Sequence, residues 1–150
     1  MEYQKLLQRA QKEKQMIPQV LGTLIIFNSE NIVEGIRRRW SFGKGVNNDI
    51  IGEYKNSDYQ AFKVYSNPNA GGYVDLTLTG ALGQGLTIRK KGDKQYEIFS
   101  TDYKFKRIAD KYGIEQFNLD QQQIEELFDM LYFTALENYL DNVYLIWVIV

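Results

Sequence analysis

Basic side chains are the groups in this sequence that most directly suggest a chemistry. Arg37, Arg38 and Arg39 are consecutive, and guanidinium groups bind phosphate oxygens well. Lys90 and Lys91 form a second short run that the fold could bring beside the arginines. The arginines also end a predicted helix, where cations stabilise the negative end of the helix dipole. The run therefore predicts either a surface that faces DNA or, the interpretation we favour, a helix end held by ion pairs.

Nucleophilic and metal-binding side chains are scarce in this chain. It has no cysteine and no histidine, which removes disulfides, thiolate chemistry, Ser-His and Cys-His catalysis and the commonest transition-metal ligands. A carboxylate-dependent enzyme would still be possible, but the acidic residues gather on one helix face, as is typical of a solvated surface. The run Gly43-Lys44-Gly45 lacks the GxxxxGK[ST] spacing of a phosphate-binding loop. We therefore expect no enzyme activity, no cofactor and no metal.

Charge is divided unevenly along the chain, although the net charge is only −1. Residues 114–150 contain seven acidic residues and no lysine or arginine, so residues 1–113 hold all 18 basic residues and 12 acidic ones. The two parts can neutralise each other within one fold. Alternatively, the acidic end of one copy can lie against the basic body of the next, which describes a head-to-tail ring.

The N-terminal third of the chain is predicted to be mainly helical. Residues 2–15 are rich in helix-forming side chains, and Pro18 should end or kink that helix. Residues 19–27 are apolar enough to be buried. Residues 29–38 open with a helix-start pattern and carry an apolar face. Glycines and asparagines over residues 40–57 predict a loop.

The middle of the chain is predicted to form a small antiparallel sheet. Residues 59–66 alternate loosely and predict a strand or an extended arm, which a cluster of turn-forming residues ends. Apolar and polar residues alternate over 74–78, which predicts a half-buried strand. Residues 86–90 and 96–100 flank a Lys-Gly-Asp-Lys turn and predict a β-hairpin.

Two helices are predicted after the hairpin. The first spans residues 103–111, is capped by residues 101–102 and is ended by Gly113. The second begins after a cap at 118–120 and runs to at least Asn142, with most of its circumference apolar. Such a helix must be covered on two sides, either as the central core helix or against another subunit.

The order of these elements predicts a single α+β domain over residues 1–150. Its parts are a helical N-terminal part at 1–40, a loop or arm at 41–73, a sheet at 74–100 and a helical C-terminal part at 101–150. The polar N-terminus predicts no signal peptide. The apolar run at 143–150 is far shorter than the ~20 residues of a membrane span, so we expect no membrane span.

Several weak motifs occur in a recognisable order between about residues 45 and 120. In chain order they are Gly52, Tyr54, Gly71, Gly72, Asp75, Leu76, Thr79, Gly80, Leu82, Leu86, Ile88, Tyr96, Ile98, Ser100, Thr101, Asp102, Lys104, Lys111, Tyr112, Gly113, Phe117 and Leu119. Their order and spacing resemble the virion-morphogenesis, head–tail joining and tail-completion proteins of tailed bacteriophages. Ala81 departs from the pattern, in which this position is often acidic or aromatic, and residues 143–150 lie outside it.

The resemblance implies a structural protein of the virion, a ring-forming head–tail connector of the neck or a tail-completion subunit around the DNA channel. Its partners would be further copies of itself, the adjacent portal, connector or tail proteins, and genomic DNA that passes without sequence-specific contact. It would be assembled in the cytoplasm of the host bacterium and reside in the neck or tail. Thr79 and Gly80 would form the corner after the strand at 74–78, with the glycine supplying a backbone angle that other residues resist.

Two sets of contact residues follow from these arguments. Tyrosine suits interfaces because an apolar ring carries a polar tip, and the chain has 11 tyrosines. The candidates for a subunit interface are Tyr59, Phe62, Tyr65, Tyr73, Asp75, Thr79, Trp147 and Ile149. The candidates for facing DNA are Arg37, Arg38, Arg39, Lys90 and Lys91. The alternative function is a nucleic-acid-binding accessory protein that uses the second set as one basic patch.

Overall fold

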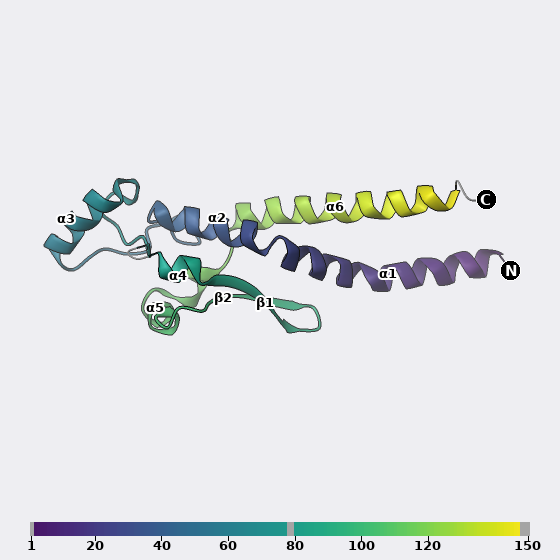
Figure 1. The fold of residues 1–150 in the computed structure, drawn as a ribbon, viewed down its shortest axis with the longest axis horizontal. Helices are drawn as coiled ribbons and strands as arrows, with labels where there is room; N and C mark the ends of the chain where they lie inside the picture. The colour runs from purple at the N-terminus through teal and green to yellow at the C-terminus, as the bar shows by residue number, and fades with distance from the viewer. Residues whose placement is uncertain (1, 78–79, 148–150) are drawn as a thin grey trace. The chain divides into compact units, whose positions relative to one another are not determined.

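A computed structural model describes residues 2–77 and 80–147, with the side chains of this part except those at 2, 3, 6, 9, 10, 13, 14 and 138–147. The fold is α+β as predicted, with N-terminal helices, a two-stranded antiparallel hairpin and a long C-terminal helix (Figure 1). Where we predicted one domain, the chain divides into two compact units. One comprises residues 29–125, and the other comprises residues 2–28 together with 126–147.

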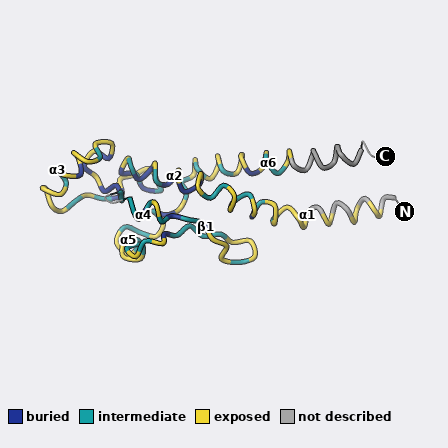
Figure 2. Tube along the Cα trace, viewed as in Figure 1, coloured by how far each residue is buried: buried dark blue, intermediate teal, exposed yellow. Residues whose placement is uncertain are grey.

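Helix α2 provides the centre of the core in the unit at 29–125. It spans Ser29–Ser41 and buries one apolar face, which packs against β1. Trp40 is fully buried and meets Phe117 edge-on, with the ring centroids 5.2 Å apart. Figure 2 shows the buried positions gathered on α2 and on the segments around it. The apolar core side chains of this unit are Ile32, Val33, Ile36, Trp40, Ile51, Ala70, Val74, Leu82, Leu86, Ile88 and Phe117.

The hairpin confirms its prediction. β1 spans Leu86–Gly92 and β2 spans Gln95–Ser100, paired antiparallel with Ile88 opposite Ile98. Leu86 and Ile88 alternate with Thr87 and are buried on one face of β1, whereas the three cations that follow them are all exposed near the turn. The register shifts just before the turn, where β1 carries an irregularity.

The segment predicted as a strand or arm at 59–66 is instead helical. It belongs to α3, Ser57–Ser66, whose first turn is capped because Asn56 Oδ1 accepts the backbone N–H of Tyr59 at 2.8 Å. The cap satisfies a donor that a helix start otherwise leaves unpaired, and this local bond outweighs the loose alternation in the sequence. A short 3-10 helix, η1 at Pro68–Ala70, follows α3.

The strand predicted at 74–78 is also absent over its described part, residues 74–77. Val74 and Asp75 are both buried, whereas a strand directs neighbouring side chains to opposite faces. Leu76 has a φ of +52°, a left-handed conformation that interrupts extended backbone. The alternation misled the prediction because Asp75 points inward rather than to solvent.

The corner predicted at Thr79 and Gly80 is described from Gly80 onward, since residues 78–79 lie outside the described part. Gly80 has a φ of +71°, as predicted for this position, and its N–H donates to the carbonyl of Thr77 at 3.3 Å. Helix α4, Ala81–Gln84, begins directly after it and leads into the hairpin.

The short helix predicted after the hairpin is α5, Phe105–Tyr112. The cap predicted at residues 101–102 is not formed, because the N-cap residue is Lys104 and no side chain caps the helix. Asp102 Oδ1 instead accepts the N–H of Lys104 at 2.7 Å in a turn that precedes the helix. Gly113, with a φ of +96°, ends the helix as predicted. The 3-10 helix η2, Ile114–Phe117, then leads towards α6.

The other unit consists of two long helices, α1 at Glu2–Phe27 and most of α6, which spans Gln121–Trp147. Of the two outcomes predicted for Pro18, an end or a kink of the first helix, the end does not occur. α1 continues through the proline, since proline removes a single backbone hydrogen bond within a run of helix formers. Residues 19–27, predicted to be buried, are largely exposed, and Phe27 retains 84% of its accessible surface. Within the described residues, no helix combines the length and the apolar character that crossing a membrane requires.

Helix α6 begins at its predicted cap. Asp120 Oδ1 accepts the N–H of Gln123 at 2.8 Å, and Gln123 Oε1 accepts the N–H of Asp120 at 2.9 Å. Beyond this turn, Leu131 is the one buried side chain of the helix among those described. Over residues 121–137, where its side chains are described, α6 is therefore mostly exposed. Its exposed large apolar side chains are Ile124, Phe128, Met130, Tyr132, Phe133 and Leu136.

Candidate functional site: a basic groove beside α5

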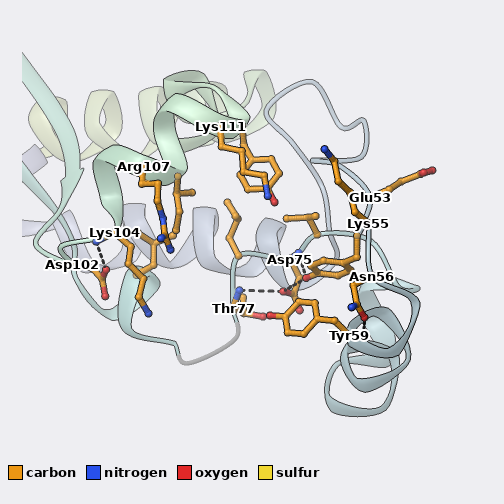
Figure 3. Close-up of a pocket in the computed structure, with 16 residues that line it drawn as sticks. Glu53, Lys55, Asn56, Tyr59, Asp75, Thr77, Asp102, Lys104, Arg107 and Lys111 are labelled. Atoms are coloured by element: carbon orange, nitrogen blue, oxygen red, sulfur yellow. Dashed lines mark hydrogen bonds between the residues drawn. The ribbon is translucent and has the colours of Figure 1, made fainter.

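An open groove of about 640 Å³ lies within the unit at 29–125. One side of it is α5, and the opposite side is formed by residues 74–77 and the chain that enters α3 (Figure 3). Val74, Leu82 and Ile108 make part of the lining apolar. The remainder of the lining is dominated by basic and tyrosine side chains.

A row of cations lines the α5 side of the groove. Lys104, Arg107 and Lys111 recur at a spacing of three and four residues, which places them on one face of the helix. Lys55 adds a fourth cation from the chain before α3. None of these four forms an ion pair with a carboxylate in the part of the chain that the structure describes.

The acidic residues of the groove offset this charge only partly. Asp102 accepts the backbone N–H of Lys104 in the turn before α5, and Figure 3 shows Glu53 pointing away from the hollow. Asp75 is neutralised by a buried lysine. The groove therefore carries a net positive charge and would attract an anionic partner.

Asp75 is the centre of a buried hydrogen-bond network on the side opposite α5. It is 1% exposed, and its Oδ1 lies 2.7 Å from Nζ of Lys63, which is 3% exposed. Oδ2 accepts from Asn67 Nδ2 at 2.7 Å, and Oδ1 also accepts the backbone N–H of Thr77 at 3.2 Å. Burial raises the pKa of Asp75, but the hydrogen bonds from Lys63, Asn67 and Thr77 outweigh it and hold that pKa below its usual value. The carboxylate therefore stays ionised and paired at neutral pH.

Two tyrosines connect this network to the groove. Tyr54 OH donates to Asp75 Oδ1 at 3.3 Å, and the Tyr54 ring meets that of Tyr59 edge-on at 5.0 Å. Burial and the charge of Asp75 raise the pKa of both phenols, and Tyr112 adds to the effect on Tyr59. Both phenols therefore remain protonated at neutral pH, as apolar rings with a polar tip at the edge of the groove.

Arg39, predicted to face DNA, is a structural residue. Its side chain is 6% exposed, and its guanidinium donates to the carbonyls of Gln116 and Asn118 at 2.8 and 2.9 Å. It also donates to Gln123 Oε1 at 2.9 Å. Burial lowers the pKa of Arg39, and Asp120 at 3.6 Å opposes that effect. The DNA-facing prediction was wrong for Arg39 because these carbonyls before α6 require a buried donor.

The other predicted DNA-facing residues form no common patch of unpaired charge. Arg37 pairs with two glutamates of its own helix and donates to the carbonyl of Gly83 at 2.7 Å. Lys91 pairs with Glu97 at 3.1 Å across the hairpin. Arg38 and Lys90 are exposed. Ion pairs, as predicted for the arginine run, are formed by Arg37 and also by Arg39, which pairs with Asp120 and donates hydrogen bonds within the core.

The predicted interface residues are distributed over several environments. Four are exposed, with Tyr65 at 89%: Tyr59, Phe62, Tyr65 and Tyr73. Tyr59 lines the groove. Asp75 is corrected, because its side chain binds Lys63 in the interior and reaches no surface. Thr79 and Ile149 lie outside the described residues, as does the side chain of Trp147.

The basic face of α5 is the feature that sequence reasoning missed. The spacing of Lys104, Arg107 and Lys111 is visible in the sequence, and projecting the predicted helix would have shown three cations on one side. By contrast, no local signal links Lys63 to Asp75. Among the described residues, no acidic cluster that could hold a metal ion is present.

No protein-family model, no curated protein and no solved structure matches this chain.

Proposed function

We propose that this chain is a structural subunit of a tailed-phage virion, which assembles into a ring as a head–tail connector or tail-completion protein. Copies of the chain contact one another around the DNA channel, and adjacent portal, connector or tail proteins bind the two ends of the ring. DNA passes through the lumen without sequence-specific contact, since tight phosphate binding would hinder its passage. The motif order between about residues 45 and 120 supports this proposal through its resemblance to such proteins.

The observation that carries the proposal is the apolar surface of the two long helices. Phe27 at the end of α1 is 84% exposed, and Phe128 and Phe133 on α6 are 66% and 59% exposed. Leu131 is the one large apolar side chain that this unit buries among those described. Exposed apolar surface on this scale marks a protein–protein contact. Contacts between copies would cover it.

The uneven charge supports a head-to-tail arrangement of the copies. Residues 114–150 hold seven acidic residues and no basic ones, whereas all basic residues lie at 1–113. Two different surfaces of opposite charge make a heterologous contact, and repetition of such a contact around an axis closes a ring.

The alternative, a nucleic-acid-binding accessory protein, gains no support from the residues assigned to it. Arg39 is buried, and Arg37 and Lys91 are engaged in ion pairs. A phosphate-binding patch needs several unpaired cations on one surface. In this set, only Arg38 and Lys90 could contribute such cations.

The test is the mass of the purified chain, measured by light scattering over a range of concentrations at low and high salt, with electron microscopy of the same sample. We expect an oligomer that appears as closed rings. Phe128→Asp adds a charge to the exposed surface of α6 and should shift the mass towards the monomer, because a buried carboxylate opposes association.

Gln121→Asp is the matched control, since it adds the same charge to an exposed position in the first turn of the same helix. It should leave the mass unchanged. A wild-type chain that stays monomeric at every concentration and at both salt levels would overturn the self-assembling ring.

A further inference from the structure

We propose that the groove beside α5 is the surface that receives α6 of a neighbouring copy of this chain. The contact joins the basic row Lys104, Arg107 and Lys111 to an acidic and aromatic face of α6. This inference rests on the proposed ring and identifies the two surfaces that meet in it.

The groove has the features of a docking surface for an acidic helix. Its three α5 cations face one hollow and make no ion pairs among the described residues, so they are available to carboxylates from outside the chain. Tyr54, Tyr59 and Tyr112 line the same hollow, and part of its lining is apolar. Figure 3 shows Arg107 on α5 and Lys104 directly before it on one side, with Asp75 and Thr77 on the opposite side.

The face of α6 that fits this groove lies between Asp129 and Glu137. Asp129, Tyr132, Phe133, Leu136 and Glu137 recur at spacings of three and four residues, so they share one side of the helix. All five side chains are exposed, with Tyr132 at 54% and Phe133 at 59%. Two carboxylates therefore flank an exposed aromatic surface.

The two surfaces match in length and in charge. At 1.5 Å per residue, Asp129 and Glu137 are about 12 Å apart along α6, and Lys104 and Lys111 are about 10 Å apart along the basic row. The carboxylates can thus pair with cations at the two ends of the row while the α6 aromatics reach the tyrosines and the apolar lining. α6 carries no lysine or arginine that would repel the groove.

A phosphate backbone fits the same groove less well. It would satisfy the cations but would leave the apolar lining and the tyrosine rings without an apolar partner. The α6 face supplies both an acidic and an apolar component, which is why we assign the groove to a second copy rather than to nucleic acid.

The experiment is a charge exchange between the two surfaces in the full chain. The groove variant carries Arg107→Glu with Lys111→Glu, and the helix variant carries Asp129→Lys with Glu137→Lys. For each variant alone, the concentration at which the light-scattering mass rises above that of the monomer should increase at least tenfold. Lys90→Glu with Lys94→Glu is the control, since it makes the same charge change at exposed hairpin positions outside the groove and should leave association unchanged.

Mixing the groove variant with the helix variant should restore association, because every contact in an alternating assembly then joins opposite charges. If the wild-type chain assembles but the mixture stays monomeric, or if either variant alone assembles as the wild type does, the groove assignment is overturned and the ring proposal stands. A monomeric wild type overturns the ring itself. A groove variant that keeps the wild-type mass but loses binding to labelled duplex DNA would assign the groove to nucleic acid and overturn this inference.

Discussion

The pair of Lys63 and Asp75 sets the local structure around the groove. Both side chains are almost completely buried, and Asp75 collects hydrogen bonds from α3, from the residue after α3 and from its own segment. An ionised carboxylate in the interior is stable only with such partners. The pair thus holds residues 74–77 against α3 and keeps this side of the groove in place.

Removing the lysine should leave a buried charge without its ionic partner. We expect Lys63→Met to lower the free energy of unfolding by about 3–5 kcal/mol, the usual cost of removing one member of a buried ion pair. Urea unfolding at one fixed protein concentration measures this change. Lys94→Met is the control, because Lys94 is exposed on the hairpin, outside the groove, and should change stability by less than about 0.5 kcal/mol. Equal effects of the two substitutions would contradict the structural role of the pair.

The same carboxylate should make stability depend on pH in the acid range. The pKa of Asp75 in the folded chain is below its ordinary value, which is about 3.9. Its contribution is therefore present above about pH 4 and is lost as the pH falls through the folded-state pKa. We expect the difference in unfolding free energy between wild type and Asp75→Asn to narrow over that range. A difference that stays constant from neutral pH to about pH 2 would show that Asp75 is not preferentially ionised in the folded state.

At the scale of single residues, the sequence predicted which side chains are exposed better than it predicted which groups the charged side chains bind. The tyrosines and Phe62 that we expected at a surface are exposed. Asp75 and Arg39 were misassigned because each charged side chain binds groups that are distant in sequence, Lys63 for one and the carbonyls before α6 for the other. A charged residue that is paired in the interior looks the same in sequence as one that faces solvent.

At the element scale, the tight junction between α4 and the hairpin depends on a glycine. A Cβ at Gly85 would lie 2.7 Å from Ser100 Oγ and 3.0 Å from the backbone nitrogen of Asp102. The backbone at this position is ordinary, so close packing alone excludes a side chain.

Gly85→Ala should therefore destabilise the chain by about 1–3 kcal/mol, the range for overpacking a well-filled site. Gly83→Ala is the control two residues earlier, where a Cβ would meet the Arg37 side chain at ordinary distances, 3.5 Å from Cγ and 3.9 Å from Cδ. Thermal unfolding followed by circular dichroism should show a lowered midpoint for the first substitution and little change for the second. The reverse order would contradict the packing described at this junction.

Elements with strong local signals were predictable from the sequence. The hairpin, α5 and α6 each combine a clear periodicity with a turn or a cap, and the structure confirms them. The segments at 59–66 and 74–77 were mispredicted because alternation over a few residues is a weak signal. In the first a single Asn56 cap favours the helix, and in the second a buried ion pair turns Asp75 inward. The groove could not be predicted from the sequence, because it forms only where the fold brings α5, α3 and residues 74–77 together.

At the scale of the whole molecule, the two units differ in how well they bury their apolar side chains. The unit at 29–125 has a core built around Trp40 and Phe117, both at most 1% exposed. Of the large apolar side chains described in the helices of the other unit, most lie at the surface. Helical stability in proteins comes mainly from packing of an apolar face. We therefore expect the long helices to gain stability from a partner that covers these apolar side chains.

This dependence predicts that thermal stability rises with protein concentration. If copies cover the apolar faces of α1 and α6, association stabilises the folded chain by mass action, and the unfolding midpoint should increase over a roughly hundredfold range of concentration. Circular dichroism at the helical minimum follows the transition. The Phe128→Asp variant, with its exposed face interrupted by a charge, should show a midpoint that is lower and independent of concentration. A wild-type midpoint that does not change with concentration, in a range where light scattering detects the oligomer, would mean that unfolding of the long helices is not coupled to association and would contradict this prediction.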